Sequence, residues 1–478
     1  MLSFVRCKSQ RQGQADQSEQ AMTDICIPSQ PKRSAASRTV LFGIFGAATF
    51  LTACAEPELV LPGQREDVWS VLQDQGDITD AQDTFEGNSN RKISLPAARE
   101  NAEWAQTAGS PANRVAHPSL GGALTLQWAA KIGEGDSRKH RITADPVVAG
   151  NRIFTLDAQS VVTATSTAGA TLWQADLRPA RDQAGDASGG GLVVAGDTVY
   201  VFIGFGVLAA MDAGTGAVRW TQQLDASGSG TPTVSGDLVY VTAGDNTGWA
   251  VSRKDGTVEW QVGSTGDTNN VLGAPAPALT DDLAIFAFGS GEVQAVFRRG
   301  GLNRWDASVL GKRAGRALSN VSDVTAAPVV SGDRVFVGNQ SGRIAALDVA
   351  SGARVWTARE GAIGPVWPVG GSVFAVSDLN ELIRLDAADG AKIWGTALPN
   401  FVKRKPLKQS RVVAHHGPIV AGGRVIIASG DGQLRSFDPT IGALVSSAEI
   451  PGGATTAPVV AGRTLYVVSK NGQLLAYR

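Results

Sequence analysis

Residues 326–356 read AAPVVSGDRVFVGNQSGRIAALDVASGARVW, and this single unit decides the fold. It opens with a short apolar run, turns at Ser-Gly-Asp, continues through further apolar strands, and ends in Gly-x-x-x-Trp. Short apolar runs separated by glycine and aspartate turns are typical of antiparallel β-strands. The unit therefore predicts a small all-β module built from hairpins.

The opening of this unit recurs along most of the chain, at intervals of 39 to 52 residues. The eight occurrences begin at Ala144, Gly191, Gly230, Ala276, Ala326, Pro365, Gly417 and Thr456. Repeats of this length suit the four-stranded blade of a propeller. We therefore predict an all-β, eight-bladed β-propeller of four-stranded blades over residues 121–478.

The second half of six units carries a tryptophan four residues after a glycine, and in three of them an aspartate stands eight residues before it. The tryptophans are Trp173, Trp220, Trp260, Trp305, Trp356 and Trp394, and the aspartates are Asp212, Asp348 and Asp386. We interpret both as structural, with tryptophan packing between blades and aspartate accepting backbone N–H groups in a turn. The seventh unit keeps Asp438 and Gly442 but has Ser446 in place of tryptophan.

Ring closure is predicted from the two ends of the repeat region. The eighth unit, Thr456 to Arg478, provides only three strands. The missing strand is predicted at Leu124 to Lys131 (LTLQWAAK), where Trp128 takes the place of the repeat tryptophan. Pairing of these segments would remove the free sheet edges that favour aggregation.

The N-terminal region has the pattern of a secretory leader. Basic residues precede an apolar run, Val40 to Leu51, which is shorter than the roughly 20 residues of a membrane-spanning helix. The run ends in Leu-Thr-Ala-Cys54, which resembles the lipobox of bacterial lipoproteins. That resemblance implies a signal peptide over residues 1–53 and lipidation of Cys54. Translation from Met1 and translation from Met22 both remain open.

Residues 54–120 are predicted to form a flexible tether, because their polar composition offers little apolar surface to offset the entropy of ordering. Alanine follows Cys54 where aspartate would, by analogy, retain a lipoprotein in the inner membrane. We therefore expect a lipid-anchored protein on the periplasmic face of the outer membrane.

Composition excludes several classes of function. The net charge of −1 argues against nucleic-acid binding. All three cysteines lie at or before Cys54, so the remainder of the chain has no disulfide framework, thiolate nucleophile or cysteine-based zinc site. Neither a His-Glu-x-x-His motif nor a phosphate-binding loop before a helix is present. We expect no enzymatic activity, no metal and no cofactor.

The spacing of aspartate, glycine and tryptophan in MDAGTGAVRW, LDVASGARVW and LDAADGAKIW resembles the PQQ-like repeat of quinoprotein-type propellers. Together with the lipobox, it is similar to the BamB family of outer-membrane assembly lipoproteins. The resemblance implies a scaffold of the β-barrel assembly (BAM) complex. It further implies binding to the POTRA domains of BamA, the barrel-inserting subunit, and contacts with nascent outer-membrane β-barrel proteins.

The same resemblance assigns partner contacts to two neighbouring loops, at about Asn269 to Leu272 and Ser322 to Thr325. It implies that Asn269, Val271, Leu272, Asp323 and Val324 form the partner-binding surface. Asp323 and Val271 keep the acidic and apolar character of the family pattern. Leu272 and Thr325 depart from it, since the family has a basic and a second acidic residue there.

Three alternatives stay open from the sequence. The chain is either a BAM scaffold, a PQQ-dependent dehydrogenase-like propeller, or an envelope lipoprotein propeller with a different partner.

Two further groups of residues were considered as sites. His415 and His416 are adjacent on one strand, so their side chains point to opposite faces and are a poor metal-binding pair. The basic run from Lys403 to Arg411 is either a solvated loop or a contact with anionic lipid or an acidic protein.

Overall fold

The computed structural model describes residues 85–478, apart from residues 116, 225, 229, 265–273, 312, 314–323 and 404. The chain divides into Met1–Arg65 and a compact unit, Glu66–Arg478, and all of the described residues belong to the second. Within that described part, no helix has the length and apolar character needed to cross a bilayer.

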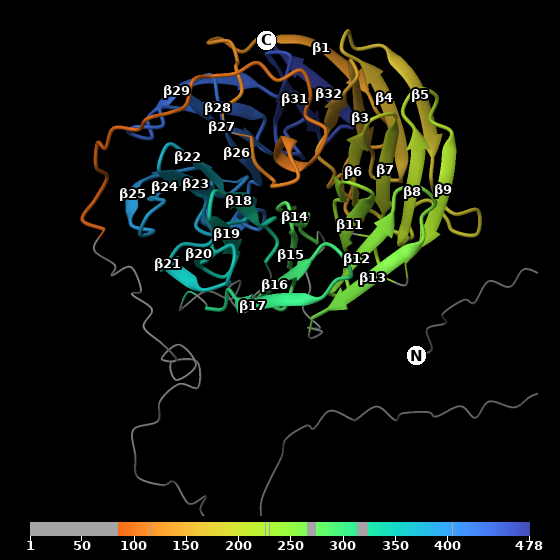
Figure 1. Cartoon of the computed structure of the whole chain (residues 1–478). Coiled ribbons are helices and arrows are strands. Elements are labelled where there is room, and N and C mark those ends of the chain that lie inside the picture. The colour runs from red at the N-terminus through yellow and green to blue at the C-terminus, as the bar shows by residue number, and fades with distance from the viewer. Residues whose placement is uncertain are drawn as a thin grey trace, which may run out of the picture. The chain divides into compact units, whose positions relative to one another are not determined.

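The described residues form a ring of eight antiparallel four-stranded sheets (Figure 1). The first strands of neighbouring blades contact one another around the centre, and the fourth strands lie at the periphery (Figure 1). The predicted eight-bladed β-propeller is therefore confirmed.

The first four blades follow the chain in order. Their strands are, in blade 1, β2 (Val147–Ala149), β3 (Arg152–Leu156), β4 (Val161–Ser166) and β5 (Thr171–Asp176); in blade 2, β6 (Gly190–Ala195), β7 (Thr198–Ile203), β8 (Val207–Asp212) and β9 (Val218–Gln223); in blade 3, β10 (Thr233–Ser235), β11 (Leu238–Thr242), β12 (Thr247–Ser252) and β13 (Val258–Gly263); and in blade 4, β14 (Ala278–Leu279), β15 (Leu283–Ala287), β16 (Glu292–Phe297) and β17 (Asn303–Ser308).

The other four blades continue the ring and close it. Their strands are, in blade 5, β18 (Val329–Ser331), β19 (Arg334–Asn339), β20 (Arg343–Asp348) and β21 (Arg354–Ala358); in blade 6, β22 (Trp367–Val369), β23 (Ser372–Val376), β24 (Glu381–Asp386) and β25 (Lys392–Ala397); in blade 7, β26 (His415–Ala421), β27 (Arg424–Ser429), β28 (Gln433–Phe437) and β29 (Leu444–Glu449); and in blade 8, β30 (Val459–Ala461), β31 (Thr464–Ser469), β32 (Gln473–Tyr477) and β1 (Leu126–Lys131).

Closure of the ring follows the predicted scheme. Strand β1 pairs antiparallel with β32, and the register places Trp128 opposite Ala476 and Lys131 opposite Gln473. Blade 8 thus takes its outermost strand from the N-terminal side of the repeats and the other three from the C-terminal side. The predicted closing segment, Leu124 to Lys131, is confirmed.

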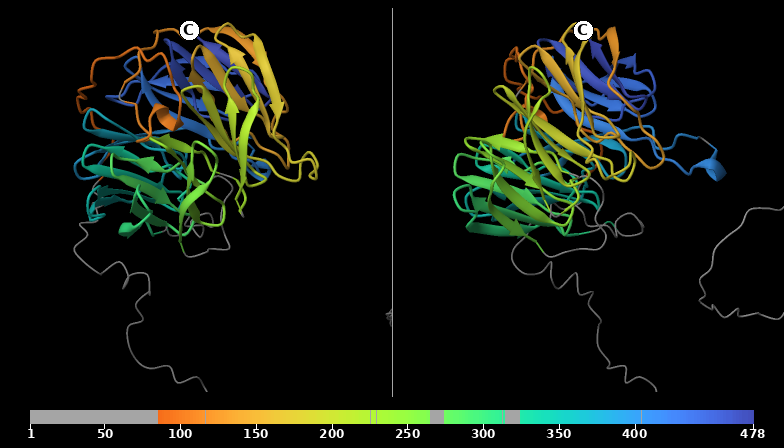
Figure 2. Two further views of the ribbon diagram at one scale, coloured as in Figure 1. Left: turned by 45° about the vertical axis from the view of Figure 1, so that its right-hand side comes forward. Right: turned by 90° about the vertical axis from the view of Figure 1, so that its right-hand side faces the viewer.

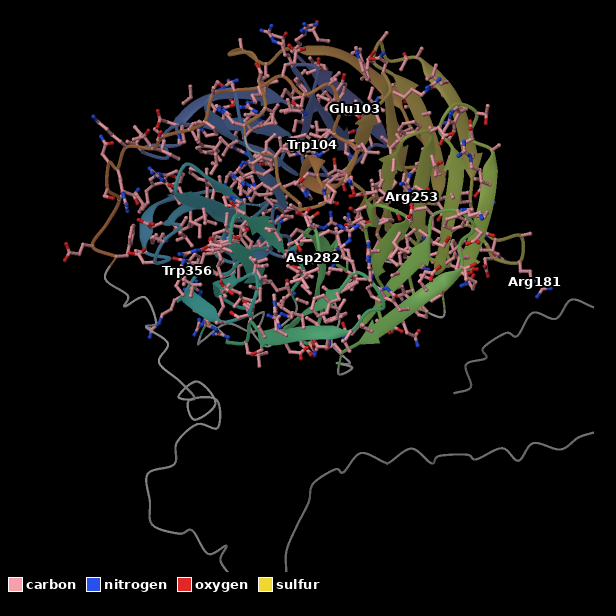
Figure 3. All side chains as sticks on the ribbon, viewed as in Figure 1. Glu103, Trp104, Arg181, Arg253, Asp282 and Trp356 are labelled. Atoms are coloured by element: carbon pink, nitrogen blue, oxygen red, sulfur yellow. The ribbon has the colours of Figure 1, made fainter. Side chains whose placement is uncertain are left out.

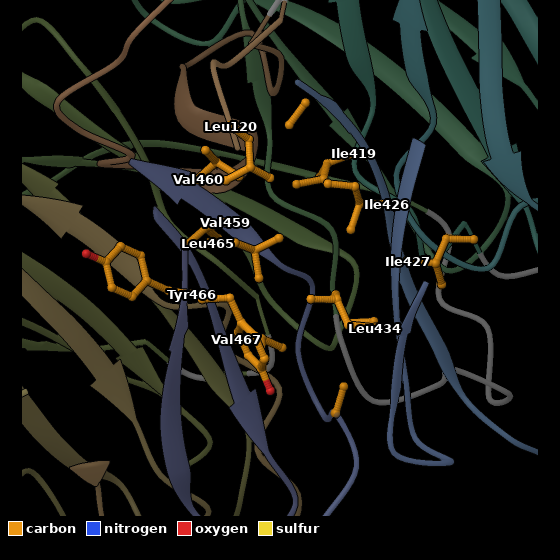
Figure 4. Close-up of a cluster of buried hydrophobic side chains, with 14 of the residues drawn as sticks. Leu120, Ile419, Ile426, Ile427, Leu434, Val459, Val460, Leu465, Tyr466 and Val467 are labelled. Carbon is orange, nitrogen blue, oxygen red and sulfur yellow. The ribbon is translucent and has the colours of Figure 1, made fainter. Parts of the chain in front are cut away.

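Burial explains the two hydrophobic patterns of the repeat. Every residue of the second strand β7 is buried, because that strand lies between two neighbouring blades. The outermost strands β5 and β9 alternate between exposed and half-buried positions, because only one of their faces meets a neighbour. The largest apolar cluster extends from blade 6 through blades 7 and 8 to blade 1, and includes Ile426, Val460 and Leu465 (Figure 4).

Residues 85–120 differ from the flexible tether that we expected. This segment contains the 3₁₀ helix η1 (Thr107–Gly109), and the buried Trp104 stacks on Trp367 with ring centroids 6.2 Å apart. The expectation was wrong for residues 85–120. A polar composition indicates only that little apolar surface can be buried, whereas this segment is held largely by backbone hydrogen bonds to the blades.

Candidate protein-binding surfaces of the ring

The seams between blades repeat one contact. In seven of the eight seams the indole N–H of the outer-strand tryptophan donates to a backbone carbonyl of the next blade, at 2.9 to 3.2 Å. The pairs are Trp128–Thr167, Trp173–Ala213, Trp220–Arg253, Trp260–Arg298, Trp305–Val349, Trp356–Ala387 and Trp394–Pro439. Each carbonyl belongs to the turn between the third and fourth strands.

The repeat glycine lies against the tryptophan of the preceding blade. A Cβ atom at Gly352 would lie 2.6 Å from the ring of Trp305, and Gly352 has a φ of +71°, which favours glycine. Gly442 stands in the same relation to Trp394. Each Gly-x-x-x-Trp motif therefore contributes to two seams. Its glycine packs against the tryptophan of the preceding blade, and its tryptophan packs against the glycine of the following blade.

The repeat aspartates fix the turns that carry these glycines. The Asp212 carboxylate accepts the backbone N–H groups of Gly214 and Thr215 at 3.0 and 2.8 Å. Its hydrogen bonds to Arg219 and Thr215 lower the pKa of Asp212 to about 2. Asp348 accepts from Ser351 in the same way, and that contact lowers the pKa of Asp348.

The seam between blades 7 and 8 is different, since Ser446 replaces the tryptophan. In blade 8 the third and fourth strands, β32 and β1, come from opposite ends of the repeat region, so no tight turn joins them. An indole at position 446 would lack the turn carbonyl that receives it elsewhere. The Tyr477 hydroxyl instead donates to the Glu449 carbonyl of blade 7 at 2.6 Å.

Residues 101–118, which we call the strap, circle one end of the ring and bond to every blade (Figures 1 and 3). The hydrogen bonds measure 2.7 to 3.2 Å. In ring order from blade 8, they are Gly462–Asn101, Val148–Trp104, Val194–Ala105, Val234–Gln106, Leu279–Pro111, Val330–Ala112, Arg114–Pro368 and Gly422–Pro118. All fall on the first strands or the turns that follow them.

Side chains of the strap reinforce this closure. The buried Asn113 side chain donates to the carbonyls of Ala276 and Pro328, at 3.0 Å each, and so joins blades 4 and 5. Trp104 is 2% exposed and lies near the middle of the ring (Figure 3). One end of the ring axis is therefore covered by the chain itself.

A PQQ-dependent dehydrogenase-like propeller would have to hold a quinone and a calcium ion. Calcium needs six to eight oxygen ligands, usually including several carboxylates. Among the described residues, no group of three or more histidine, cysteine, aspartate or glutamate side chains is placed to hold a metal ion. The described part of the ring therefore does not supply the group of carboxylates that this calcium ion would need.

The predicted functional residues separate into two groups. Cys54, Asn269, Val271, Leu272 and Asp323 lie outside the described residues, so their assignments stay predictions. Val324 is described, and it is 1% exposed within an apolar cluster of blades 4 and 5. Its side chain is part of the core, which corrects our expectation that it belongs to a partner-binding surface.

The remaining flanks of the two predicted loops are also fixed to the ring. At the first loop, the Ser264 amide donates to the Asn246 carbonyl at 3.0 Å. At the second, the Val309 amide donates to the Gly291 carbonyl at 2.8 Å and the Thr325 hydroxyl donates to the Ile363 carbonyl at 3.3 Å. The first loop joins β13 to β14 and the second joins β17 to β18. They are therefore consecutive connections between blades 3, 4 and 5, each leading from an outermost strand to an innermost one.

Eight blades with Trp–Gly contacts at seven of their eight seams define a PQQ-like β-propeller. A family model described as outer membrane protein assembly factor BamB matches residues 158–396 and 402–478. The chain belongs to this BamB family.

Individual relatives agree with this assignment. BamB of Yersinia pestis is 24% identical over 361 residues, which are 74% of this chain and 88% of that protein. BamB of Escherichia coli K12 is 23% identical over 355 residues, or 73% of this chain and 87% of that protein.

Solved structures share the fold at lower identity. The crystal structure of BamB from Moraxella catarrhalis gives a TM-score of 0.62 at 19% identity, covering 74% of this chain and all of that one. Quinohemoprotein alcohol dehydrogenase from Comamonas testosteroni gives a TM-score of 0.59 at 14% identity, covering 80% of this chain and 81% of that one. Because one fold serves both an assembly factor and an enzyme, function has to be argued from the surfaces.

Proposed function

We propose that this chain is a non-catalytic scaffold of the BAM complex, which binds the POTRA domains of BamA and assists the assembly of outer-membrane proteins. The observation that carries the proposal is the family match over residues 158–396 and 402–478. Both predicted partner loops fall inside the first matched range.

The architecture supports a binding role. Seven of the eight seams carry the same indole hydrogen bond, and the strap bonds to all eight blades, so the blades are held in one fixed arrangement. A fixed ring presents its connections at constant spacing, which lowers the entropy cost of binding a partner. We place the proposed partner contact on two consecutive blade connections, 264–277 and 309–328.

Crosslinking in living cells tests the proposed partner. A photoreactive residue at position 272 or 323 is expected to capture BamA. The matched control is position 302. Leu302 is 69% exposed and lies in the turn between β16 and β17, so it belongs to the same blade 4 as the two loops but not to either loop. Equal capture from position 302, or capture of another protein in place of BamA, would contradict the proposal.

We also propose that the chain is held at the periplasmic face of the outer membrane by lipid on Cys54. The Leu-Thr-Ala-Cys54 sequence after the apolar run supports this. The Cys54→Ser variant is expected to move from the membrane fraction to the soluble periplasmic fraction, while Cys26→Ser, as the control, stays with the membrane. Membrane retention of Cys54→Ser would contradict the lipid anchor.

A further inference from the structure

A projecting hairpin between blades 6 and 7 takes part in neither the seams, the strap nor the proposed partner loops. Residues 399–413, which we call the basic hairpin, leave the ring after β25 and return before β26 (Figure 2, right). The Val413 amide donates to Asn400 at 2.8 Å and the Val402 amide donates to Arg411 at 3.0 Å, so two strands run back along each other. The short 3₁₀ helix η3 (Pro406–Lys408) lies between them.

The side chains of the basic hairpin combine positive charge with exposed apolar surface. Its sequence, PNFVKRKPLKQSRVV, contains five basic residues and no acidic one. Among the described residues, Lys403, Lys405, Lys408 and Arg411 make no ion pair. Leu407 in η3 is fully exposed, and Val402 and Val412 are more than half exposed. Such a combination is typical of segments that lie in a lipid interface.

The base of the basic hairpin is fixed to the ring. Val413 is buried, and the next strand begins with His415, whose ring nitrogens bond to the Ser429 hydroxyl and the Pro399 carbonyl, each at 2.8 Å. Burial lowers the pKa of His415. The hairpin therefore projects from a firm attachment to the ring.

The N-terminal end of the described chain leads to the same place. Arg91, Ser89 and Asn88 bond in turn to Asp386, Ile393 and Gly395, so the chain read backwards follows β25. Strand β25 ends at Ala397, two residues before the basic hairpin. The described chain therefore begins along the strand that leads into the hairpin. Residues 55–84, between Cys54 and the described chain, span at most about 110 Å.

We propose that the basic hairpin binds the surface of an anionic phospholipid membrane, with its lysines at the headgroups and Leu407 inserted between them. The proposal goes beyond the scaffold function and concerns how the ring is oriented on its membrane. Basic residues attract anionic headgroups without regard to their arrangement, and a convex apolar tip fits a surface that it can penetrate. Anchor and hairpin would then hold the blade 6 and 7 sector toward the bilayer.

Vesicle binding tests this directly with the cysteine-free compact unit Glu66–Arg478, which carries no lipid and whose ring is closed by its own strands. Vesicles of phosphatidylglycerol and phosphatidylcholine are expected to bind it, and vesicles of phosphatidylcholine alone are not. Each basic residue near such a surface contributes about 1 kcal/mol, which is roughly a fivefold change in partitioning. The Lys405→Gln/Lys408→Gln variant is therefore expected to bind about 25-fold more weakly.

The matched control removes the same charge elsewhere. Lys254 and Arg299 are exposed in turns between third and fourth strands, away from the basic hairpin. The Lys254→Gln/Arg299→Gln variant is expected to bind within about twofold of the unchanged protein, since only nearby charges act strongly. Absence of vesicle binding, equal binding to uncharged vesicles, or an equal loss in the control would each overturn the proposal.

A second readout follows insertion at the tip. An environment-sensitive fluorophore on Leu407→Cys is expected to shift to the blue when anionic vesicles are added, and one on the exposed Leu302→Cys is not. An unchanged spectrum at position 407, or tight binding of an acidic protein by a hairpin without affinity for vesicles, would overturn the membrane assignment. Neither assay contains BamA, so their outcome is independent of the proposed scaffold function.

Discussion

The seams and the strap hold the same ring by opposite means. Each Trp–Gly seam is local, involves two neighbouring blades, and recurs seven times. The strap is a single non-repeating segment that contacts all eight blades in order around one end of the axis. Nearest-neighbour contacts make a ring stable, as in other repeat proteins, whereas a segment that touches every repeat couples distant blades.

Breaking one seam is expected to have the largest effect on stability. Trp394 is completely buried, so Trp394→Ala removes a large apolar side chain and leaves a cavity between blades 6 and 7. The free energy of unfolding in urea is expected to fall by about 4 kcal/mol. Leu444→Ala, at an exposed position of the neighbouring outermost strand, is expected to change it by less than about 0.5 kcal/mol. Equal losses from both variants would contradict the seam model.

Releasing the strap is expected to cost less and to be felt more widely. Trp104→Ala removes the stacking on Trp367, and we expect a loss of about 3 kcal/mol. Hydrogen exchange is expected to accelerate at strap-bonded amides in several blades, including those of Val148, Leu279 and Gly422. Amides of the outermost strands serve as the internal control. Faster exchange confined to blade 1 would show that the strap does not act as one unit.

The same comparison explains what the sequence could predict. The blades repeat at a regular spacing, so the eight recurring unit openings were enough to predict eight blades, and the fourth strand missing from the last unit was enough to predict the closing strand that holds Trp128. The strap has no period, and its bonds come largely from main-chain atoms that every residue possesses. Trp104 was its one sequence signal, a single aromatic residue in a polar segment. Contacts of this kind become visible only when the ring that receives them is in place.

The eighth seam gives a smaller and pH-dependent effect. Tyr477→Phe removes the hydrogen bond to Glu449 and is expected to cost about 1 kcal/mol at pH 7. Burial raises the pKa of Tyr477 to about 12, above the usual value of 10. The folded state therefore holds this proton more tightly, and the stabilisation is lost as pH rises from 10 toward 12. The difference between Tyr477→Phe and the unchanged protein is expected to shrink over that range, as measured by urea unfolding. A constant difference would assign the loss to packing alone.

Restoring the repeat at Ser446 is expected to have the smallest effect. If tryptophan stabilised every seam by apolar burial alone, Ser446→Trp would strengthen the weakest one by more than 1 kcal/mol. The other seven indoles also donate to a turn that blade 8 lacks, since β32 and β1 are not consecutive in the chain. We therefore expect a change of less than about 0.5 kcal/mol in the free energy of unfolding. A clear increase in the free energy of unfolding would show that a tryptophan stabilises a seam without a turn carbonyl to accept its indole N–H. The way the ring closes would then not explain why serine stands at position 446.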